Sequence, residues 1–455
     1  MIVALACGAM TMAAAGADAS ASASTNQPAP PPESVPQNAV QAGPPQGQLW
    51  NWHVQNTDII QADPGFPAKY SGTNSLLAGG EGKETVSLDL LAGVRLWRGA
   101  EFHVDGLMWQ GFGLSKTLGI EAFPSGEAYR LGTKVPNVTF ARVFLRQTFG
   151  LGGEPEAVPD DALNLAGSVD SRRLTLTLGK LSAKDLFDPN TYANDPRGQF
   201  MNWALSSDEA WDYPADSLGY ETGLAAELDL PPWALRYGFF QMPSRANDMA
   251  QDTHYLEAWG MVAELERRFA INTHPGAVRA LAFLNSAHMG SFAEALQSPV
   301  RPADIIATRA YRLKYGFGLN LEQEIVTNLG VFTRVGWSDG HTEGWCYSDV
   351  DRTVTAGLSL KGQFWNRPND TFGLGGVFSG LSKVHQEFFE AGGVGILAGD
   401  GRLNYGWEKC LETYYDFQIW KTLHGTLDYQ FVTDPAFNRD RGPVSVLGAR
   451  VHWEF

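Results

Sequence analysis

From residue 50 to the C-terminus, the sequence repeats segments of about ten residues in which apolar and polar side chains alternate. In YRLKYGFGLN, every second residue from Tyr311 to Leu319 is apolar, and Arg, Lys, Gly and Asn occupy the positions between. Because successive side chains of a β-strand point to opposite faces, each such segment is predicted to be a strand with one apolar face. Sixteen segments follow this pattern, at 50–61, 85–98, 100–112, 138–149, 172–181, 218–229, 233–242, 257–268, 277–288, 307–318, 329–338, 352–361, 371–379, 411–420, 424–432 and 444–455.

The number and spacing of these segments predict an all-β fold, a transmembrane antiparallel up-and-down β-barrel of about 16 strands. The number is even, as in bacterial outer-membrane barrels, and no run after residue 48 is long enough for a membrane helix. The 50 Gly and the many aromatic residues also suit strands and tight turns. A soluble all-β protein would show alternation too, but the export signal and the terminal aromatic residue described below favour the membrane barrel.

The connections between the segments alternate in length, as such barrels require. Outer-membrane barrels have short periplasmic turns and longer outer loops. The expected short turns lie at Gly99, Pro231-Pro232, 272–276, 319–328, 365–370 and 421–425. The expected outer loops lie at 62–84, 113–137, 182–217, 243–256, 289–306, 339–351, 380–410 and 433–443. The connection 150–171 breaks the rule, because it should be periplasmic yet has about twenty residues, for which the sequence offers no physical reason.

The two ends of the chain indicate export to an outer membrane. Residues 1–19 are apolar or small and end in Ala-Asp-Ala, which predicts a signal peptide; a membrane anchor is the alternative, but the run is short. The usual basic n-region is missing, so the true start is expected further upstream. Residues 20–48 are rich in Pro and Ser and predict a flexible segment before a barrel at 49–455. We expect Phe455 to be recognised by barrel-assembly machinery in a Gram-negative outer membrane, with lipid and lipopolysaccharide around the barrel.

Charge and side-chain spacing exclude several other classes of function. The net charge of −16 argues against nucleic-acid binding. The histidines and carboxylates show neither metal-ligand spacing nor a catalytic pair, so we predict no enzyme activity, no metal and no cofactor. Cys7 is lost with the signal peptide. Cys346 and Cys410 fall at the outer rim, where they could form a disulfide in an oxidising envelope or remain free thiols.

A barrel of sixteen strands is wide enough for an aqueous channel, so the side chains that face the lumen decide what passes. Strand parity places these residues on lumenal faces: Arg95, Arg142, Arg146, Arg236, Arg312, Lys314 and Glu264. Basic groups opposite carboxylates would hydrogen-bond the hydroxyl groups of a sugar. For any one of them, bracing of the barrel wall is an equally good interpretation.

Residues 187–205, FDPNTYANDPRGQFMNWAL, suit neither a helix nor a strand. With the preceding Leu186 and the following WDYPADSLGYETGLAAEL, this stretch resembles the signature region of the OprB-type carbohydrate-selective porins. RRLTLTLGK, YGFFQMPSRAN, NLEQEI and DRGPVSVLGARVHWEF resemble that family in order and spacing, so the similarity runs from about residue 50 to the terminus. The resemblance implies a 16-stranded outer-membrane channel for monosaccharides and related small sugars, without a cofactor. At Arg146 the chain departs from the family, which often has an acid there, so the sugar preference is not carried over.

The signature stretch lies in the third outer loop, residues 182–217, which in large porins usually folds back into the lumen. Its prolines would hold it off the strands. The side chains expected to meet the solute are Asp188, Asn190, Arg197, Gln199, Asn202 and Trp203; packing against the wall is the structural alternative.

These features predict passive, carbohydrate-selective diffusion through a narrow channel formed by a monomer or a homotrimer. The alternatives are a less selective porin for small anions or polyols and a polysaccharide export channel.

Overall fold

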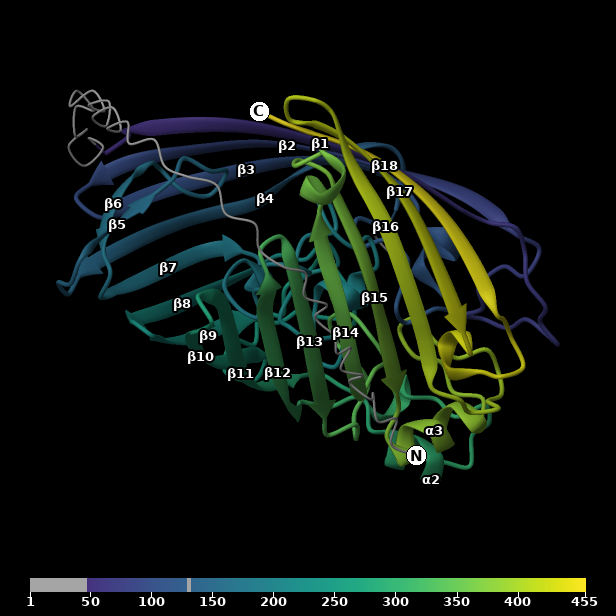
Figure 1. Ribbon diagram of the computed structural model, residues 1–455. Coiled ribbons are helices and arrows are strands. Elements are labelled where there is room, and N and C mark those ends of the chain that lie inside the picture. Colours follow the sequence, from purple (N-terminus) through teal and green to yellow (C-terminus); the bar gives the residue numbers. More distant parts are fainter. Residues whose placement is uncertain (1–46, 129–131) are drawn as a thin grey trace, which may run out of the picture. The chain divides into compact units, whose positions relative to one another are not determined.

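The computed structural model describes residues 47–128 and 132–455. Within them sixteen strands form one closed antiparallel barrel, in which β1 pairs with β18 (Figure 1). The predicted signal peptide, residues 1–19, and residues 20–46 of the predicted flexible segment lie outside the described residues.

The barrel strands confirm all sixteen predicted segments. They are β1 (Trp50–Asp63), β2 (Glu81–Trp97), β3 (Ala100–Gly111), β4 (Thr133–Gly150), β7 (Arg173–Leu181), β8 (Glu221–Leu230), β9 (Trp233–Gln241), β10 (Trp259–Ile271), β11 (His274–Ala287), β12 (Arg312–Val326), β13 (Leu329–Ser338), β14 (Arg352–Lys361), β15 (Thr371–Gly380), β16 (Glu408–Trp420), β17 (Leu423–Thr433) and β18 (Val444–Glu454). A separate two-stranded sheet, β5 (Pro155–Val158) and β6 (Gly167–Asp170), lies in the connection between β4 and β7.

The alternation in the sequence places apolar side chains outside the barrel and polar ones inside. On β12, Phe317 and Leu319 are each 55% exposed, whereas Lys314 and Asn320 are buried. On β18, Leu447 and Val451 are exposed and Arg450 is buried. A soluble β-sandwich would bury its apolar face, so this arrangement is that of a barrel whose outer surface contacts lipid. No helix in the described ranges is long and apolar enough to cross a membrane.

One strand boundary differs substantially from its prediction. Residues 319–328 were predicted to be a turn, but β12 continues to Val326 and turns into β13 at Thr327 and Asn328. The alternation of apolar and polar residues was followed only to residue 318, and the next ten residues were assigned to a short turn. In the barrel, Asn320 and Glu322 point inward and bond the third outer loop, so the strand extends past them.

Apart from the connection between β4 and β7, the connections are short at one end of the barrel and long at the other. By the usual arrangement of such barrels, we assign the short end to the periplasm. The helices α1 (Trp203–Ser206), α2 (Phe292–Gln297) and α3 (Lys383–Glu390) all lie in outer loops. Figure 1 shows α2 and α3 side by side at the end opposite to β5 and β6.

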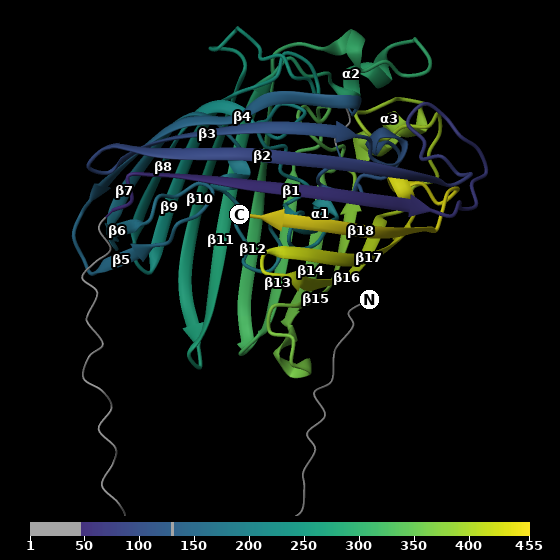
Figure 2. The same ribbon diagram turned by 90° about the horizontal axis from the view of Figure 1, so that it is seen from above.

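The third outer loop, residues 182–220, folds into the lumen as predicted. Its helix α1 contacts β14 and β15 within the ring of strands (Figure 2). Phe200, Trp203 and Trp211 of this loop are buried in the largest apolar cluster, which also contains inward-facing residues of several strands, such as Phe332 and Tyr414. The lumen is therefore partly filled by a packed loop.

Candidate solute channel

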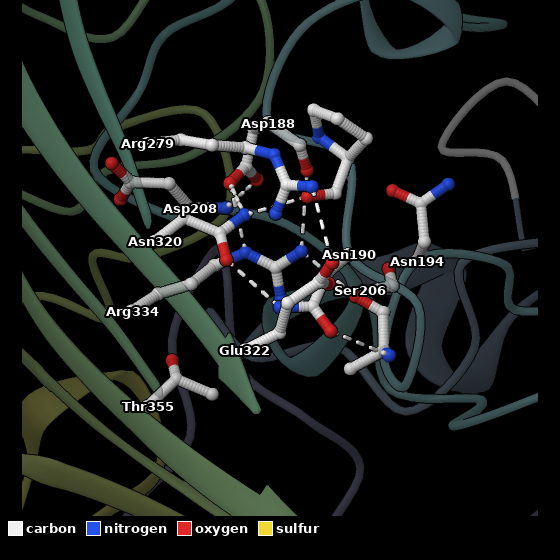
Figure 3. A network of polar contacts seen from close by, with 12 residues as sticks. Asp188, Asn190, Asn194, Ser206, Asp208, Arg279, Asn320, Glu322, Arg334 and Thr355 are labelled. Carbon is white, nitrogen blue, oxygen red and sulfur yellow. Dashed lines mark hydrogen bonds and ion pairs between the residues drawn. The ribbon is translucent and has the colours of Figure 1, made fainter. Parts of the chain in front are cut away.

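The third loop is attached to one half of the barrel wall through a buried ion pair. Arg334 of β13 is fully buried, and its Nε donates to Asp188 Oδ1 at 2.9 Å (Figure 3). The same guanidinium donates to the carbonyl oxygens of Ala193 and Leu205 at 2.8 and 3.0 Å. One side chain thus fixes three points of the loop, which only the planar, five-donor geometry of arginine allows.

Carboxylates of neighbouring strands bind the backbone of the same loop. Glu264 of β10 accepts from the Asp188 backbone N–H at 2.7 Å, and Glu322 of β12 accepts from that of Thr191 at 2.6 Å. Asn320 of β12 donates to Asp188 Oδ1 at 2.6 Å. Buried backbone groups of an irregular loop need such partners, because no strand ladder satisfies them.

The second half of the signature stretch is held by the last three strands. Glu412 of β16 accepts from the backbone N–H groups of Met201 and Asn202 at 2.6 and 3.1 Å. The Asn202 side chain donates to Gln430 of β17 at 2.9 Å, and Arg450 of β18 donates to the Gln199 carbonyl oxygen at 2.8 Å. Together with the Arg334 contacts, these bonds press the loop against the strands from β10 to β18.

Among the cavities in the described part of the chain, two lie along the opposite half of the wall. The first has a volume of about 510 Å³ and the second about 400 Å³. The first is bordered by Gln55 of β1, Arg142 of β4 and the third loop. The second is bordered by strands β2 to β4 and β7 to β9. Because Asp185 and Pro189 border both, we infer that the cavities adjoin there and form one path.

Two arginines that border the first cavity are each paired with two carboxylates. Arg197 of the third loop lies 2.6 Å from Asp89 of β2 and 3.0 Å from Glu127 of the connection after β3. Arg142 of β4 lies 2.7 Å from both Asp105 of β3 and Asp185 of the third loop. These pairs place cationic donors and anionic acceptors close together, which suits hydroxyl groups that both donate and accept.

Stacked aromatic rings form part of the same cavity. Trp203 stacks on Phe123 with ring centroids 5.2 Å apart, and on Tyr347 with centroids 5.4 Å apart. Tyr347 in turn stacks on Tyr213 at 4.4 Å. All four rings border the first cavity, so an apolar surface lies beside the charged pairs.

The second cavity contains an arginine whose partners differ from those of the others. Arg95 pairs with Glu101 at 3.1 Å, and Arg236 pairs with Glu227 and with Glu264. Arg146 instead donates to the carbonyl oxygen of Leu163 at 2.8 Å and to Asn164 Oδ1 at 3.0 Å. No described carboxylate lies within ion-pair distance of it, so Arg146 contributes net positive charge to this cavity.

Residues 73–455 match the family model described as carbohydrate-selective porin, OprB family. The chain belongs to the OprB family of porins. Among solved structures, OprB of Pseudomonas putida, in a high-pH form, matches with a TM-score of 0.68 and 16% identity over 90% of this chain and 94% of that one. At this identity the match shows the shared fold.

Two other solved porins match at lower similarity. OccK2 of Pseudomonas aeruginosa in complex with glucuronate has a TM-score of 0.44 and 10% identity over 90% of this chain and 99% of that one. A mutant porin of Rh. blastica has a TM-score of 0.44 and 9% identity over 90% of this chain and 100% of that one. No curated protein sequence matches.

In this OprB-family porin, six of the thirteen predicted solute-contacting residues border a cavity. Arg142, Arg197 and Trp203 border the first cavity, and Arg95, Arg146 and Arg236 border the second. The membrane barrel of an OprB-family porin indicates an outer-membrane location.

The other predicted residues lie elsewhere. Five of them are buried and border neither cavity: Asp188, Asn190, Asn202, Glu264 and Lys314. The first four take part in the bonds that anchor the third loop. Lys314 lies 3.7 Å from Asp212 of that loop. Gln199 bonds the loop's own backbone. Arg312 lies at the outer rim, where it pairs with Glu294 at 2.6 Å. Strand parity correctly predicts an inward direction but says nothing of what fills the lumen there.

Several cavity residues were not predicted from the sequence. Asp105, which borders neither cavity but pairs with Arg142, shares a lumenal face with the predicted arginines, so strand parity could have identified it. Glu127, Asp185 and Tyr347 lie in connections, where no periodicity shows which way a side chain points.

The cysteines left open by the sequence are both free and buried in the structure. Cys346 packs with Trp345 and Met289, whereas Cys410 lies in the largest apolar cluster beside Asn202. Over residues 47–128 and 132–455, no group of three or more His, Cys, Asp or Glu side chains is arranged to hold a metal ion.

Neighbouring charges give two acids of the third loop opposite pKa shifts. Burial alone would raise the pKa of Asp188, but Arg334 and Lys184 outweigh it and lower this pKa to about 2. Burial, and then the negative charge of Asp188, raises the pKa of Asp208 to about 7. Asp208 therefore favours its protonated form in the folded loop.

We expect Asp208→Asn to make the third loop less sensitive to a rise in pH from about 4 to about 7. Because the folded pKa of Asp208 lies above its ordinary value near 4, its contribution to stability is present at low pH. It is lost as the pH rises towards 7, by up to about 1.4 kcal/mol per pH unit. Proteolysis of the loop should accelerate between pH 5 and pH 8 in the wild type, and less so in Asp208→Asn. Asp304→Asn changes an exposed loop acid and should follow the wild type; an Asp208→Asn profile equal to the wild type contradicts the prediction.

Proposed function

We propose that this OprB-family porin lets small neutral sugars diffuse passively along the two adjoining cavities, with the third loop as the constriction. The observation that carries the proposal is the path itself: two polar cavities of about 510 and 400 Å³ remain where the anchored loop leaves part of the wall uncovered. Cavities of this size suit small organic solutes.

The groups around the first cavity support a neutral, hydroxyl-rich solute. Arg142 and Arg197 are ion-paired, so their charges are largely neutralised, and both side chains border the cavity beside their carboxylate partners. The aromatic side chains of Trp203 and Tyr213 border the same cavity and give it an apolar side, which suits the C–H groups of a sugar ring. A channel must bind its solute weakly enough to release it, and replacing part of the hydration shell by several modest contacts meets that requirement.

A second candidate, a channel for small anions, is favoured by Arg146. This arginine adds positive charge to the second cavity without an ion-paired carboxylate. Glu101, Asp185 and Glu227 border the same cavity, however, and oppose the entry of an anion. We therefore place neutral sugars first.

Liposome swelling with purified protein tests this function. We expect monosaccharides to enter several times faster than disaccharides, and faster than amino acids or sugar acids of similar size. Single-channel recordings should show small, steady conductance. Equal rates for monosaccharides and size-matched amino acids contradict sugar selectivity, faster entry of sugar acids supports the anion channel, and the absence of any conductance contradicts the channel itself.

Three further expectations stay predictions: the recognition of Phe455 by assembly machinery, the contact with lipopolysaccharide, and the choice between monomer and homotrimer. Phe455 exchanges backbone hydrogen bonds with Val54 of β1, and its ring lies 5.3 Å from that of Trp52. The C-terminal residue thus continues the pairing that closes the barrel.

A further inference from the structure

The connection between β4 and β7 is far longer than its neighbours at the periplasmic end. It covers residues 151–172, whereas five of the other connections at that end have two residues each, such as Pro231-Pro232, and the one before β15 covers residues 362–370. Its outer part is the hairpin of β5 and β6, and the tip of that hairpin is residues 159–166. We call residues 159–166 the periplasmic tip.

The periplasmic tip is bonded across the mouth of the barrel. The side-chain amide of Asn51, on β1, donates to Asp160 Oδ1 at 2.8 Å and to the Asn164 carbonyl oxygen at 2.9 Å. Arg146, on β4, donates to the Leu163 carbonyl oxygen at 2.8 Å. Since β2 and β3 lie between β1 and β4, the tip spans four strands.

The residue before the barrel also binds the tip. The backbone N–H of Gln48 donates to the Ala166 carbonyl oxygen, and the Gln48 side-chain oxygen accepts from the Ala166 N–H, both at 2.8 Å. Arg95 of β2 donates to the Gln48 carbonyl oxygen at 2.9 Å. The tip therefore has fixed partners on β1 and β4 and, through Gln48, on β2.

The same tip borders both cavities of the channel. Asp161 and Leu163 border the first cavity, and Asn164 and Leu165 border the second. Leu165 is 1% exposed, so the second half of the tip is packed against the barrel, while residues 159–161 are exposed. A solute that has passed the third loop still has to pass this segment before it reaches the periplasm.

We propose that the periplasmic tip is a second filter of the channel, which limits solute size independently of the third loop. This inference rests on the proposed function, because the filter acts on the path assigned there. The third loop narrows the lumen from the outer side and is held mainly by β10 to β18, with further ion pairs to β2 and β4. The tip narrows the lumen from the periplasmic side and is held by β1 and β4 and, through Gln48, by β2. Two separately anchored elements on one path explain why this periplasmic connection is so long.

Replacing residues 151–172 by Asn-Gly tests the filter. Gly150 pairs directly with Arg173, so a two-residue turn of this kind can join β4 to β7 without changing their register. We expect the single-channel conductance to rise about twofold, since a narrow segment in series is removed. In liposome swelling, the rate for disaccharides should rise relative to that for monosaccharides. Unchanged conductance together with an unchanged ratio overturns the proposal.

A point variant keeps the test valid if the shortened barrel does not assemble. Asn51→Ala removes the amide that binds the tip to β1, and should raise both the conductance and its fluctuations. Asn369→Ala is the matched control: Asn369 lies in the periplasmic turn before β15, bonds Gln418 at 2.8 Å and borders neither cavity. Identical recordings for Asn51→Ala and Asn369→Ala overturn the filter.

The two proposals fail in different ways. If the wild type conducts ions but admits no sugar, the proposed function is wrong, and the filter is then judged on ion conductance alone by the same comparison. If the wild type admits sugars and the shortened variant has the same size limit, only the filter is wrong.

Discussion

Replacing Arg334 by methionine should convert the channel into a wider and less selective pore. Methionine fills much of the volume of the arginine stem but removes every donor that binds Asp188, Ala193 and Leu205. It also leaves the buried Asp188 carboxylate without its strongest partner, a loss that costs about 3–5 kcal/mol in buried ion pairs. We expect a loss of this size to exceed the free energy that keeps the first half of the third loop on β13, so this half should detach.

The expected measurements separate loop release from barrel failure. Single-channel conductance should rise and become noisy, disaccharides should enter liposomes nearly as fast as monosaccharides, and protease should cut within residues 188–206. Heat-modifiable gel migration should stay, because the strand pairing does not involve the arginine side chain. Arg367→Met, which changes a half-exposed arginine of a periplasmic turn, should leave all of these unchanged. A tight, selective Arg334→Met channel would show that the other anchors alone hold the loop.

Replacing Arg197 by alanine should change the charge selectivity of the channel. Arg197 reaches from the third loop to Asp89 and Glu127 across the first cavity. Without it, these two carboxylates face the cavity unneutralised, and the path is widened by the length of a side chain. At an effective dielectric constant between that of a protein surface and that of water, one such carboxylate attracts a cation by about 1 kcal/mol, which is roughly a fivefold preference.

Reversal potentials in a salt gradient measure this preference, and liposome swelling measures the sugar flux. Arg197→Ala should shift the reversal potential towards that of a cation channel and alter the ratio of sugar to ion flux. Arg197→Lys keeps the positive charge and should restore most of the wild-type potential. Arg301→Ala, at an exposed position in an outer loop, is the control that should change neither quantity. An Arg197→Ala channel with the wild-type reversal potential would exclude Arg197 from the conducting path.

The strands of the barrel could be predicted because each carries its own signal. Alternation of apolar and polar residues is a local property of the sequence. Each strand needs it along nearly its whole length, because one face contacts lipid outside the barrel and the other faces polar groups inside it. Residues 319–326 of β12 are the exception, because they were predicted to belong to a turn. The partners of Asn320 and Glu322 lie more than a hundred residues earlier in the third loop, so no local pattern could show that the strand continues.

The candidate site was predictable only in part, for the same reason. Arg142 and Arg197 border the first cavity, as their positions on a lumenal face and in the loop expected to enter the lumen suggested; their contact with a solute stays a prediction. Asp188 and Asn202 share that loop, yet they anchor it to the wall. Whether a polar residue of a folded-in loop faces the wall or the path depends on which side of the lumen the loop occupies.

By itself the sequence determined the barrel, its strand count, the apolar outer face and the family. Those properties follow from the local alternation of apolar and polar residues and from one long signature stretch. Only the tertiary structure decided that the third loop packs mainly against β10 to β18, that two cavities lie along β1 to β4 and β7 to β9, and that the periplasmic tip borders both cavities. The physical reason is that these features arise from hydrogen bonds and ion pairs between residues far apart in the chain, and their energies depend on distances that the sequence does not contain.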